Sequence, residues 1–338
     1  MTGGTGFVGG HTVAALVAAG HEARLLVRSP DRVARALGPL GIEAEAVQAR
    51  VGDVTDAASV RDAVAGCDAL VHGACVYSLD PRRAGEIQRV NARGTETVLR
   101  SGAEAGVDPI VHVSSYAALL PGDPGRLLDG GSPVGAAPTP YCASKAASEA
   151  VARVLQEEGA PVHISYPGMV WGPDDPHLGV SSRLALQLLA GRLPLLPRGT
   201  MPVGDVRDVA AVHAAQLAVP GGGRRDVASG ENVPIVELVR TAVRLTGRRL
   251  PVAGMPAAAA GATGALGQVL GRGGIDLVPG REAVWIASQD GSADPSATVR
   301  ELGVSFRRAI ESVRDTIRWL HAAGHLPARR AGDLARTG

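Results

Sequence analysis

The chain has 338 residues and a formal net charge of +1; 45% of its residues are hydrophobic and 20% are charged. These proportions are those of an ordinary folded protein, so they exclude extensive disorder. A chain this close to neutral has no basic field for nucleic acid and no acidic field for basic partners. We therefore expect its partner to be a small-molecule substrate or another subunit.

Cysteine usage and hydropathy indicate the setting in which the chain works. The three cysteines are too few and too irregularly spaced for a disulfide framework or a zinc site, so we expect no metal. The first residues lack the basic and apolar segments of a secretory signal. The longest uncharged stretch, 251–270, is mostly alanine with proline and several glycines, which indicates a buried or lid-forming helix rather than a membrane span. Together these features predict a cytoplasmic protein.

A glycine-rich turn, MTGGTGFVGG, opens the chain. Gly3, Gly6 and Gly9 stand where a dinucleotide-binding turn needs them, for the tight bend, the approach to pyrophosphate and the packing of the next helix. Such a turn normally follows a buried strand, and here none precedes it. We expect the first strand to be truncated, and our hypothesis is that Met1 is a mis-assigned start in a protein with about five to ten further residues.

Arg28 ends the first apolar run, 23–27, about twenty residues beyond the glycines. An acidic residue at this place suits a free ribose hydroxyl, whereas an arginine suits a 2′-phosphate. Arg28, together with Arg32, therefore favours NADP as the cofactor, with NAD as the alternative.

Short apolar runs alternate with helical patterns through the first two thirds of the chain. The runs are 23–27, 69–72, 110–113 and 162–165, and the helical stretches are 12–19, 58–65, 91–105 and 144–158. This spacing is typical of parallel strands joined by helical crossovers. The predicted fold class is α/β, with a Rossmann-type doubly wound parallel sheet.

The pattern changes after residue 172, where further helices are expected at 181–190, 206–218, 234–246 and 306–323. This later region looks like a smaller, mainly helical C-terminal cap that binds substrate. We assign residues 1–172, with a return segment near 202–230, to the NAD(P)-binding domain, residues 173–201 and 231–327 to the cap, and residues 328–338 to a flexible tail. The segment 121–140 is rich in proline and glycine and is expected to be a long loop beside Ser115 and Tyr141.

Lys145 is the only lysine of the chain, so the other 33 of the 34 basic residues are arginine. Lysine has a slim stem and a tunable pKa, and this position has kept it where arginine serves elsewhere. Tyr141 stands four residues earlier, in PYCASK, and on a helix that spacing puts both side chains on one face. Because a nearby ammonium favours the phenolate and lowers the pKa of a tyrosine, the pair suits proton transfer at an alcohol or carbonyl.

The motifs together resemble the extended branch of the short-chain dehydrogenase/reductase superfamily, the NAD-dependent epimerases and dehydratases. The resemblance covers most of the chain and rests on TGGTGFVG, GDVTD (52–56), VNARGTETVL (90–99), VHVSS (111–115), YCASK (141–145) and YPGMVWGP (166–173). It implies that Ser115, Tyr141 and Lys145 are catalytic. Ser115 and Tyr141 would hold the substrate oxygen, and Lys145 would also contact the nicotinamide ribose.

The resemblance also implies a set of cofactor-binding residues. They are Gly3, Thr5, Gly6, Phe7, Val8, Gly9, Arg28, Asp53, Val54, His72, Gly73, Ala74, Tyr141, Lys145, Pro167 and Gly168. Two of them have a plain structural alternative, since Asp53 is also a typical turn former and His72 a typical core histidine. Asn91 resembles the structural asparagine that opens a helix near the site, and helices of the 91–105 type imply a homodimer.

Within this branch the pattern is most similar to dihydroflavonol reductases and 3β-hydroxysteroid dehydrogenases. Sugar-nucleotide enzymes commonly carry an asparagine before the YPGMVWGP corner, which is missing here, and the cap is rich in leucine, alanine and valine. The resemblance implies an NADP-preferring oxidoreductase that acts on an apolar ketone or secondary alcohol, with Tyr141 as proton donor or acceptor. The alternatives are a nucleotide-sugar epimerase or dehydratase with tightly bound NAD, and a non-catalytic NADP-binding sensor or scaffold.

Overall fold

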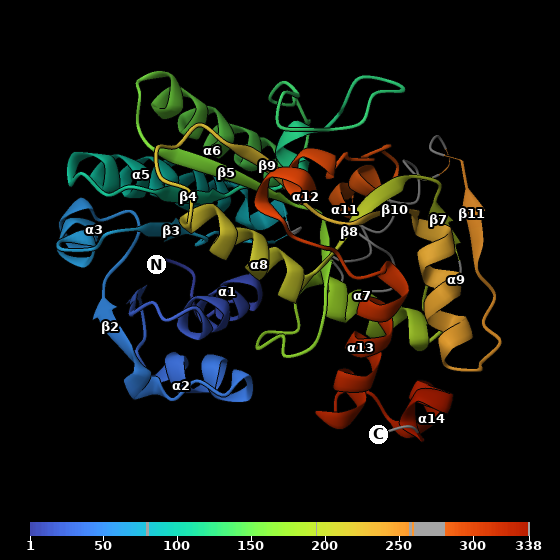
Figure 1. Cartoon of the computed structure of the whole chain (residues 1–338). Helices are drawn as coiled ribbons and strands as arrows, with labels where there is room; N and C mark the ends of the chain where they lie inside the picture. The colour runs from blue at the N-terminus through green and yellow to red at the C-terminus, as the bar shows by residue number, and fades with distance from the viewer. Residues whose placement is uncertain (79–80, 194, 257–258, 260–280, 337–338) are drawn as a thin grey trace.

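Six parallel strands form the main sheet of the computed structural model, which describes residues 1–78, 81–193, 195–256, 259 and 281–336. They are β1 (Ala23–Val27), β2 (Val47–Val51), β3 (Leu70–His72), β4 (Ile110–Val113), β5 (Val162–Pro167) and β9 (Arg225–Ala228). Strand β1 pairs with β2, and the order on the other side is β3-β4-β5-β9. Thr2 joins the two parts, because it makes parallel bridges to Leu26 of β1 and to His72 of β3 (Figure 1).

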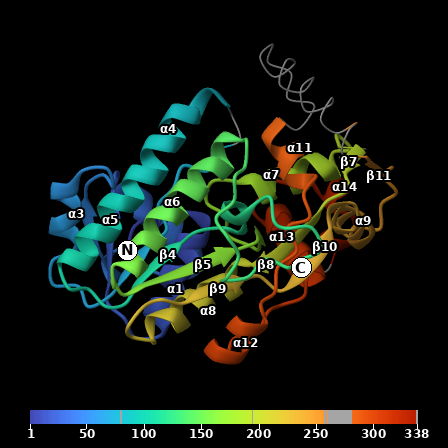
Figure 2. The same ribbon diagram turned by 90° about the horizontal axis from the view of Figure 1, so that it is seen from above.

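Helices cover both faces of this sheet (Figures 1 and 2). One face carries α1 (Phe7–Ala18), α2 (Asp31–Leu37) and α8 (Val206–Leu217), and the other carries α3 (Ala57–Val64), α4 (Ala84–Gln88), the π-helix η4 (Arg89–Arg93), α5 (Gly94–Glu104) and α6 (Pro140–Glu157). Strands β3, β4 and β5, which are buried along almost their whole length, are mostly apolar, as the continuous runs of the sequence indicated. The predicted α/β doubly wound fold is confirmed.

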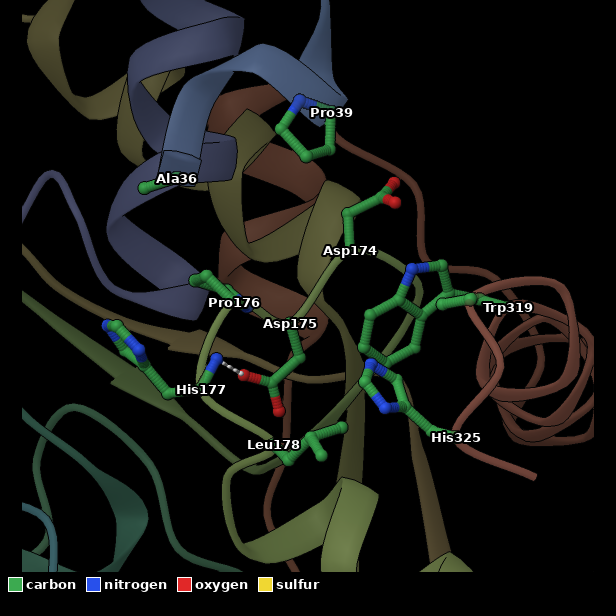
Figure 3. A pocket seen from close by; sticks show the side chains of 10 residues that line it. Ala36, Pro39, Asp174, Asp175, Pro176, His177, Leu178, Trp319 and His325 are labelled. Carbon is green, nitrogen blue, oxygen red and sulfur yellow. Dashed lines mark hydrogen bonds between the residues drawn. The ribbon is translucent and has the colours of Figure 1, made fainter. Parts of the chain in front are cut away.

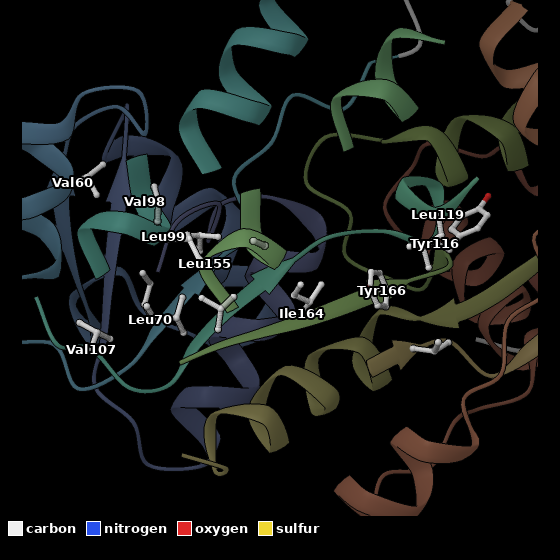
Figure 4. Close-up of a cluster of buried hydrophobic side chains, with 14 of the residues drawn as sticks. Val60, Leu70, Val98, Leu99, Val107, Tyr116, Leu119, Leu155, Ile164 and Tyr166 are labelled. Atoms are coloured by element: carbon white, nitrogen blue, oxygen red, sulfur yellow. The ribbon is translucent and has the colours of Figure 1, made fainter. Parts of the chain in front are cut away.

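The largest apolar core lies between the sheet and the face that carries α5 and α6 (Figure 4). Val98 and Leu99 of α5 and Leu155 of α6 pack there against Ile110 and Ile164 of the strands, and all five are at most 3% exposed. Short 3₁₀ turns occur between the helices and strands of the N-terminal part of the chain: η1 (Gly38–Leu40), η2 (Ala44–Ala46), η3 (Pro81–Arg83) and η5 (Tyr116–Leu119). The core therefore holds α6 rigidly against the sheet.

The C-terminal part is mainly helical and carries two small sheets. Its strands are β6 (Met169–Trp171), β7 (Leu195–Pro197), β8 (Thr200–Asp205), β10 (Glu231–Pro234) and β11 (Ala253–Met255); its helices are α7 (Val180–Leu189), α9 (Ile235–Leu245), α11 (Arg281–Ala287), α12 (Ser296–Leu302), α13 (Ala309–Ala322) and α14 (Ala328–Ala331). Trp171, Leu238 and Ile317 form the centre of a second core. Of the uncharged stretch 251–270, residues 257–258 and 260–270 lie outside the described residues.

The end of the chain differs from the flexible tail that we expected from residue 328 onward. Residues 328–335 form α14 and the 3₁₀ turn η6 (Gly332–Ala335), and Ala331 and Leu334 lie in the second core. The Asp333 amide donates to the Thr246 carbonyl at 3.1 Å. No local pattern predicts this docking, because it depends on a close backbone approach at Gly332, where a Cβ would lie 1.9 Å from the Thr246 oxygen.

None of the helices in the described residues is both long and apolar enough to cross a bilayer.

Candidate active site

Ser115, Tyr141 and Lys145 lie in one buried region at the carboxyl edge of β4. Tyr141 and Lys145 lie one turn apart on α6, and Ser115 begins η5 directly after β4. Their exposed fractions are 8% for Ser115, 7% for Tyr141 and 4% for Lys145. Ala117 of η5 packs in one apolar cluster with Tyr141 and its neighbour Cys142. The structure thus brings together the two segments from which the sequence predicted the catalytic residues.

The Lys145 ammonium is directed at the main chain of the neighbouring strand. Its Nζ donates to the Val113 carbonyl oxygen at 3.2 Å. Burial, and next to it the neighbouring Tyr77, raises the pKa of Tyr141 well above its ordinary value of 10. The net shift of this pKa is therefore upward, opposite to the lowering that we expected from the neighbouring Lys145, because burial of the phenol disfavours its charged form.

Asn91 connects the segment after β3 to the catalytic helix. Its Nδ2 donates to the Ser144 hydroxyl of α6 at 3.0 Å and to the Val76 carbonyl at 3.2 Å, and its Oδ1 accepts from the Val76 amide at 2.7 Å. The ring of Tyr77, one residue further, lies 4.6 Å from the ring of Tyr141. Asn91 lies inside the π-helix η4 rather than at the start of a helix, and its role is to join three segments around Tyr141.

A buried polar triad fixes the middle of α6 to β5. The Tyr166 hydroxyl donates to Glu149 Oε1 at 2.5 Å, and Arg153 Nε donates to the same oxygen at 2.7 Å. Glu149 is fully buried, so the arginine supplies the counter-charge that a carboxylate needs there. This contact holds the helix one turn beyond Lys145.

Helix α11 contributes residues that the sequence did not identify as part of the site. Glu282 is 5% exposed, and its Oε1 accepts from the Tyr141 amide at 2.7 Å and from the Cys142 amide at 3.1 Å. Trp285 and Ile286 pack against the cluster that contains Tyr141. No local pattern could have found them, because they lie more than 140 positions along the chain from the tyrosine.

The glycine-rich turn has the close backbone contacts that a nucleotide cradle requires. A Cβ at Gly3, whose φ is +76°, would lie 2.6 Å from the Ala74 amide nitrogen, and one at Gly9 would lie 2.0 Å from the Gly3 oxygen. Helix α1 begins at Phe7 with no side chain capping it, so the first amides, including that of Val8, are directed toward the turn without a partner inside the helix. These residues fit a pyrophosphate, which favours free amides at a helix start.

His72 occupies the core with both of its ring nitrogens. Nδ1 lies 2.8 Å from the Thr2 hydroxyl, and Nε2 lies 3.0 Å from the Thr95 hydroxyl. Its ring also stacks on that of His112 at 5.6 Å. The His72 side chain is therefore a structural core residue. Gly73 and Ala74 follow it after β3, and their backbone atoms lie close to Gly3.

The residues expected at the adenosine end lie at the edges of β1 and β2. Arg28 follows β1 and is exposed. Asp53 accepts from the Thr55 hydroxyl at 2.7 Å and from the Thr55 amide at 2.9 Å, and these two bonds lower the pKa of its carboxyl. Asp53 thus acts as a turn former, which was the structural alternative for this residue. Val54 packs against Gly94, where an added Cβ would lie 2.8 Å from the valine side chain.

Pro167 and Gly168 end β5 on the same edge of the sheet. A Cβ at Gly168 would lie 2.1 Å from the Pro202 carbonyl oxygen, so only glycine fits there. This close packing sets the position of the corner that leads from the sheet into β6.

A separate groove of about 380 Å³ is lined by none of the three catalytic candidates (Figure 3). It is lined by Ala36 and Pro39, the loop 174–178, Trp319, Ala323 and His325. Its loop touches the glycine-rich turn, where His177 Nε2 lies 3.1 Å from the Thr5 carbonyl oxygen. Across the described ranges, no three His, Cys, Asp or Glu side chains are grouped so that they could hold a metal ion.

Residues 1–227, which include the glycine-rich turn and all three catalytic candidates, match the NAD dependent epimerase/dehydratase family. The chain belongs to this family. The match covers the whole main sheet except the last residue of β9. The resemblance inferred from the motifs is thereby confirmed.

Two curated proteins are similar to this family member over almost its whole length. One is the 4-hydroxy-2-methyl-3-oxo-4-farnesyl-3,4-dihydroquinoline-1-oxide ketoreductase of Stigmatella aurantiaca, 28% identical over 334 residues, which are 96% of each chain. The other is a putative dihydroflavonol 4-reductase of Synechocystis, 28% identical over 338 residues, with 96% of this chain and 95% of that protein covered. The predicted similarity to dihydroflavonol reductases is confirmed.

Among solved structures, the dTDP-glucose 4,6-dehydratase DesIV of Streptomyces venezuelae, a double mutant with NAD and a second ligand bound, is 25% identical. Its TM-score is 0.71, and 95% of each chain is covered. This chain thus shares its fold with a protein whose solved structure contains bound NAD.

Proposed function

We propose that this protein is an NADP-preferring oxidoreductase that interconverts an apolar ketone and a secondary alcohol. The observation that carries the proposal is the buried pair of Tyr141 and Lys145 on one face of α6, beside the segment that begins with Ser115. Groups that hold and move protons gain most from fixed geometry in a site without bulk water.

The cofactor would lie across the carboxyl edge of the sheet, with its pyrophosphate at the start of α1 and its 2′-phosphate beside Arg28. When bound, NADPH supplies the hydride. The cradle at Gly3 and Gly9 supports this placement, because no side chain would fit at either position. Lys145 would hold the nicotinamide ribose with its ammonium.

Ser115 and Tyr141 would act on the substrate oxygen. The Ser115 hydroxyl accepts from the Ala117 amide at 3.2 Å, which leaves its own hydrogen free to orient a carbonyl oxygen. As the carbonyl becomes an alkoxide it is a stronger base than a phenolate, so the protonated Tyr141 gives up its proton. The Lys145 ammonium then faces a phenolate on the same side of the helix.

An apolar substrate fits the side chains around the tyrosine. Ala117, Ala137, Trp285 and Ile286 surround Tyr141 and Cys142 in one apolar cluster. Two similar proteins, named as a ketoreductase and a putative dihydroflavonol 4-reductase, act on ring-bearing molecules according to their names. A nucleotide-sugar would require polar groups at this wall.

The test is Tyr141→Phe, which removes one hydroxyl and keeps the ring. We expect turnover of apolar ketones with NADPH to fall about 10³-fold, while a fluorescence titration gives the parent affinity for NADPH. Parent turnover in the variant would contradict the proposal and favour an NADP-binding sensor or scaffold. NAD that copurifies and does not exchange would favour an epimerase or dehydratase.

We further propose that the protein is a cytoplasmic homodimer paired through the region 91–105. Light scattering measures the mass directly. A mass of one chain at working concentration would contradict the dimer.

A further inference from the structure

The start of the catalytic helix has no cap of its own. Thr139 is the N-cap residue of α6 but makes no side-chain capping bond, and the first turn holds no acidic residue. The first amides of a helix need an acceptor, since they have no partner within the helix. For Tyr141 and Cys142 that acceptor is the Glu282 carboxylate from α11.

This contact reaches the proton-transferring residue itself. The Glu282 oxygen binds the main chain of Tyr141 at 2.7 Å and lies at the positive end of the helix dipole. Burial of Glu282 raises the pKa of its carboxyl, while the bonds from the Cys142 and Tyr141 amides oppose that rise. A buried carboxylate that accepts two amide bonds is therefore a directional anchor rather than a surface contact.

The helix that carries this anchor also carries part of the apolar wall. Trp285 and Ile286 follow Glu282 on α11 and pack on the cluster of Tyr141 and Cys142. The other end of α11 is equally fixed, because a Cβ at Gly199 would lie 2.3 Å from the Ala287 carbonyl oxygen. Any shift of the wall would thus be transmitted to Tyr141 through Glu282.

We propose that Glu282 is a positioning residue that holds Tyr141 in place. It also couples the position of Tyr141 to the binding of substrate against Trp285 and Ile286. This inference rests on the proposed function of Tyr141. In chemical terms, Glu282 touches neither substrate nor cofactor, and it acts through two main-chain bonds. Its contribution is to the turnover step, because a small displacement of a proton donor slows the reaction far more than it weakens binding.

The test compares Glu282→Ala and Glu282→Gln with a matched control, Glu231→Ala. Glu231 is also a carboxylate that caps a helix from another element, since it accepts from the Ala309 amide at the start of α13 at 2.9 Å. We expect Glu282→Ala to lower kcat about 10- to 100-fold, with the KM and the NADPH affinity changed less than about threefold. Glu282→Gln should recover most of kcat, because its amide oxygen still accepts. Glu231→Ala should lower the melting temperature without changing kcat.

Hydrogen exchange of the peptide 139–147 gives a readout that is independent of turnover. Loss of protection at the Tyr141 and Cys142 amides in Glu282→Ala, but not in Glu231→Ala, is expected. Parent kcat and parent exchange in Glu282→Ala would overturn the inference, and so would Glu282→Gln that is as slow as the alanine variant. Tyr141→Phe, measured beside them, separates the two proposals: if it retains turnover the proposed function fails, whereas if it alone loses turnover only the role of Glu282 fails.

Discussion

The two ends of the proposed cofactor site differ in how their side chains are held. At the catalytic end Ser115, Tyr141 and Lys145 are at most 8% exposed, and their supports come from β4, η4 and α11. At the adenosine end Arg28 is exposed, and the Asp53 carboxylate accepts from Thr55, which is only two positions along the chain.

This difference sets how strongly each end should respond to substitution. A buried polar group has partners that water cannot replace, so losing one is costly. An exposed charge acts in a medium that screens it, and its effects are small and graded. Substitutions at the catalytic end should therefore cause large losses of turnover, whereas substitutions at the adenosine end should change the cofactor affinity by small amounts.

Gly9→Ala, in the glycine-rich turn between the two ends, is expected to have the largest effect on stability and on cofactor binding. The new Cβ would lie 2.0 Å from the Gly3 oxygen and 2.7 Å from its carbon, and both belong to backbone that cannot move aside cheaply. We expect a loss of about 3 kcal/mol in the free energy of unfolding, measured in urea, and loss of NADPH binding. Gly38→Ala is the control, since its φ is −53° and no atom lies within 4 Å of the added carbon. Equal losses in both variants would contradict this explanation.

Lys145→Arg tests the catalytic end directly. Lys145 is 4% exposed, and its Nζ donates to the Val113 carbonyl. The guanidinium of arginine is wider and planar, so it cannot put a compact charge at the same buried point. We expect kcat to fall about 100-fold, which corresponds to about 2.7 kcal/mol in the barrier. Steady-state kinetics at saturating NADPH checks this, because Lys145 is also proposed to contact the nicotinamide ribose and the cofactor affinity can change as well. Turnover within twofold of the parent would mean that the solitary lysine is not required by the chemistry.

Local patterns predicted the parts of the molecule that depend on local spacing. The alternation of apolar runs and helices gave the parallel sheet, and the four-residue offset between Tyr141 and Lys145 placed both on α6. In each case the deciding information lies within a few residues of chain. The same holds for Gly3 and Gly9, whose need for glycine is visible in the turn itself.

What depends on distant contacts could not be predicted in this way. Glu282 meets Tyr141 across 141 positions, and the last turn of chain docks through Gly332 onto Thr246. The direction of the Tyr141 pKa shift was also missed, because sequence shows the neighbouring lysine but not how completely the phenol is buried. Burial is a property of the assembled fold, and here it sets the direction of the shift.

The pH dependence of stability sharpens the comparison, since two buried histidines lie on adjacent strands below the catalytic end. Burial, with Lys145 as the next cause, lowers the pKa of His72 to about 3, and burial lowers that of His112 well below its ordinary value. The folded state then stays neutral where the unfolded chain binds protons. The stability that each contributes is complete above about pH 6.5 and is lost as the pH falls toward the lowered pKa of the folded state, which is about 3 for His72.

His112→Leu isolates one of these groups. Between pH 7 and 5 we expect the parent to lose about 2 kcal/mol for each such histidine, and the variant to lose about 2 kcal/mol less than the parent. The substitution removes no hydrogen bond to a described residue, because neither ring nitrogen of His112 has such a partner. Urea unfolding at the two pH values measures this, and equal losses in parent and variant would show that His112 is protonated in the folded state.

Arg28→Ala should have the smallest effect, because it acts at the exposed end. We expect NADPH to bind about tenfold more weakly, or about 1.4 kcal/mol, with NADH unchanged, since only NADPH carries the 2′-phosphate. The difference should shrink at high salt, as it does for any exposed charge pair. Arg35→Ala, an exposed arginine on α2, controls for the general loss of positive charge. If Arg28→Ala weakens both cofactors equally, the residue does not select between them, and the preference for NADP must come from another part of the adenosine end.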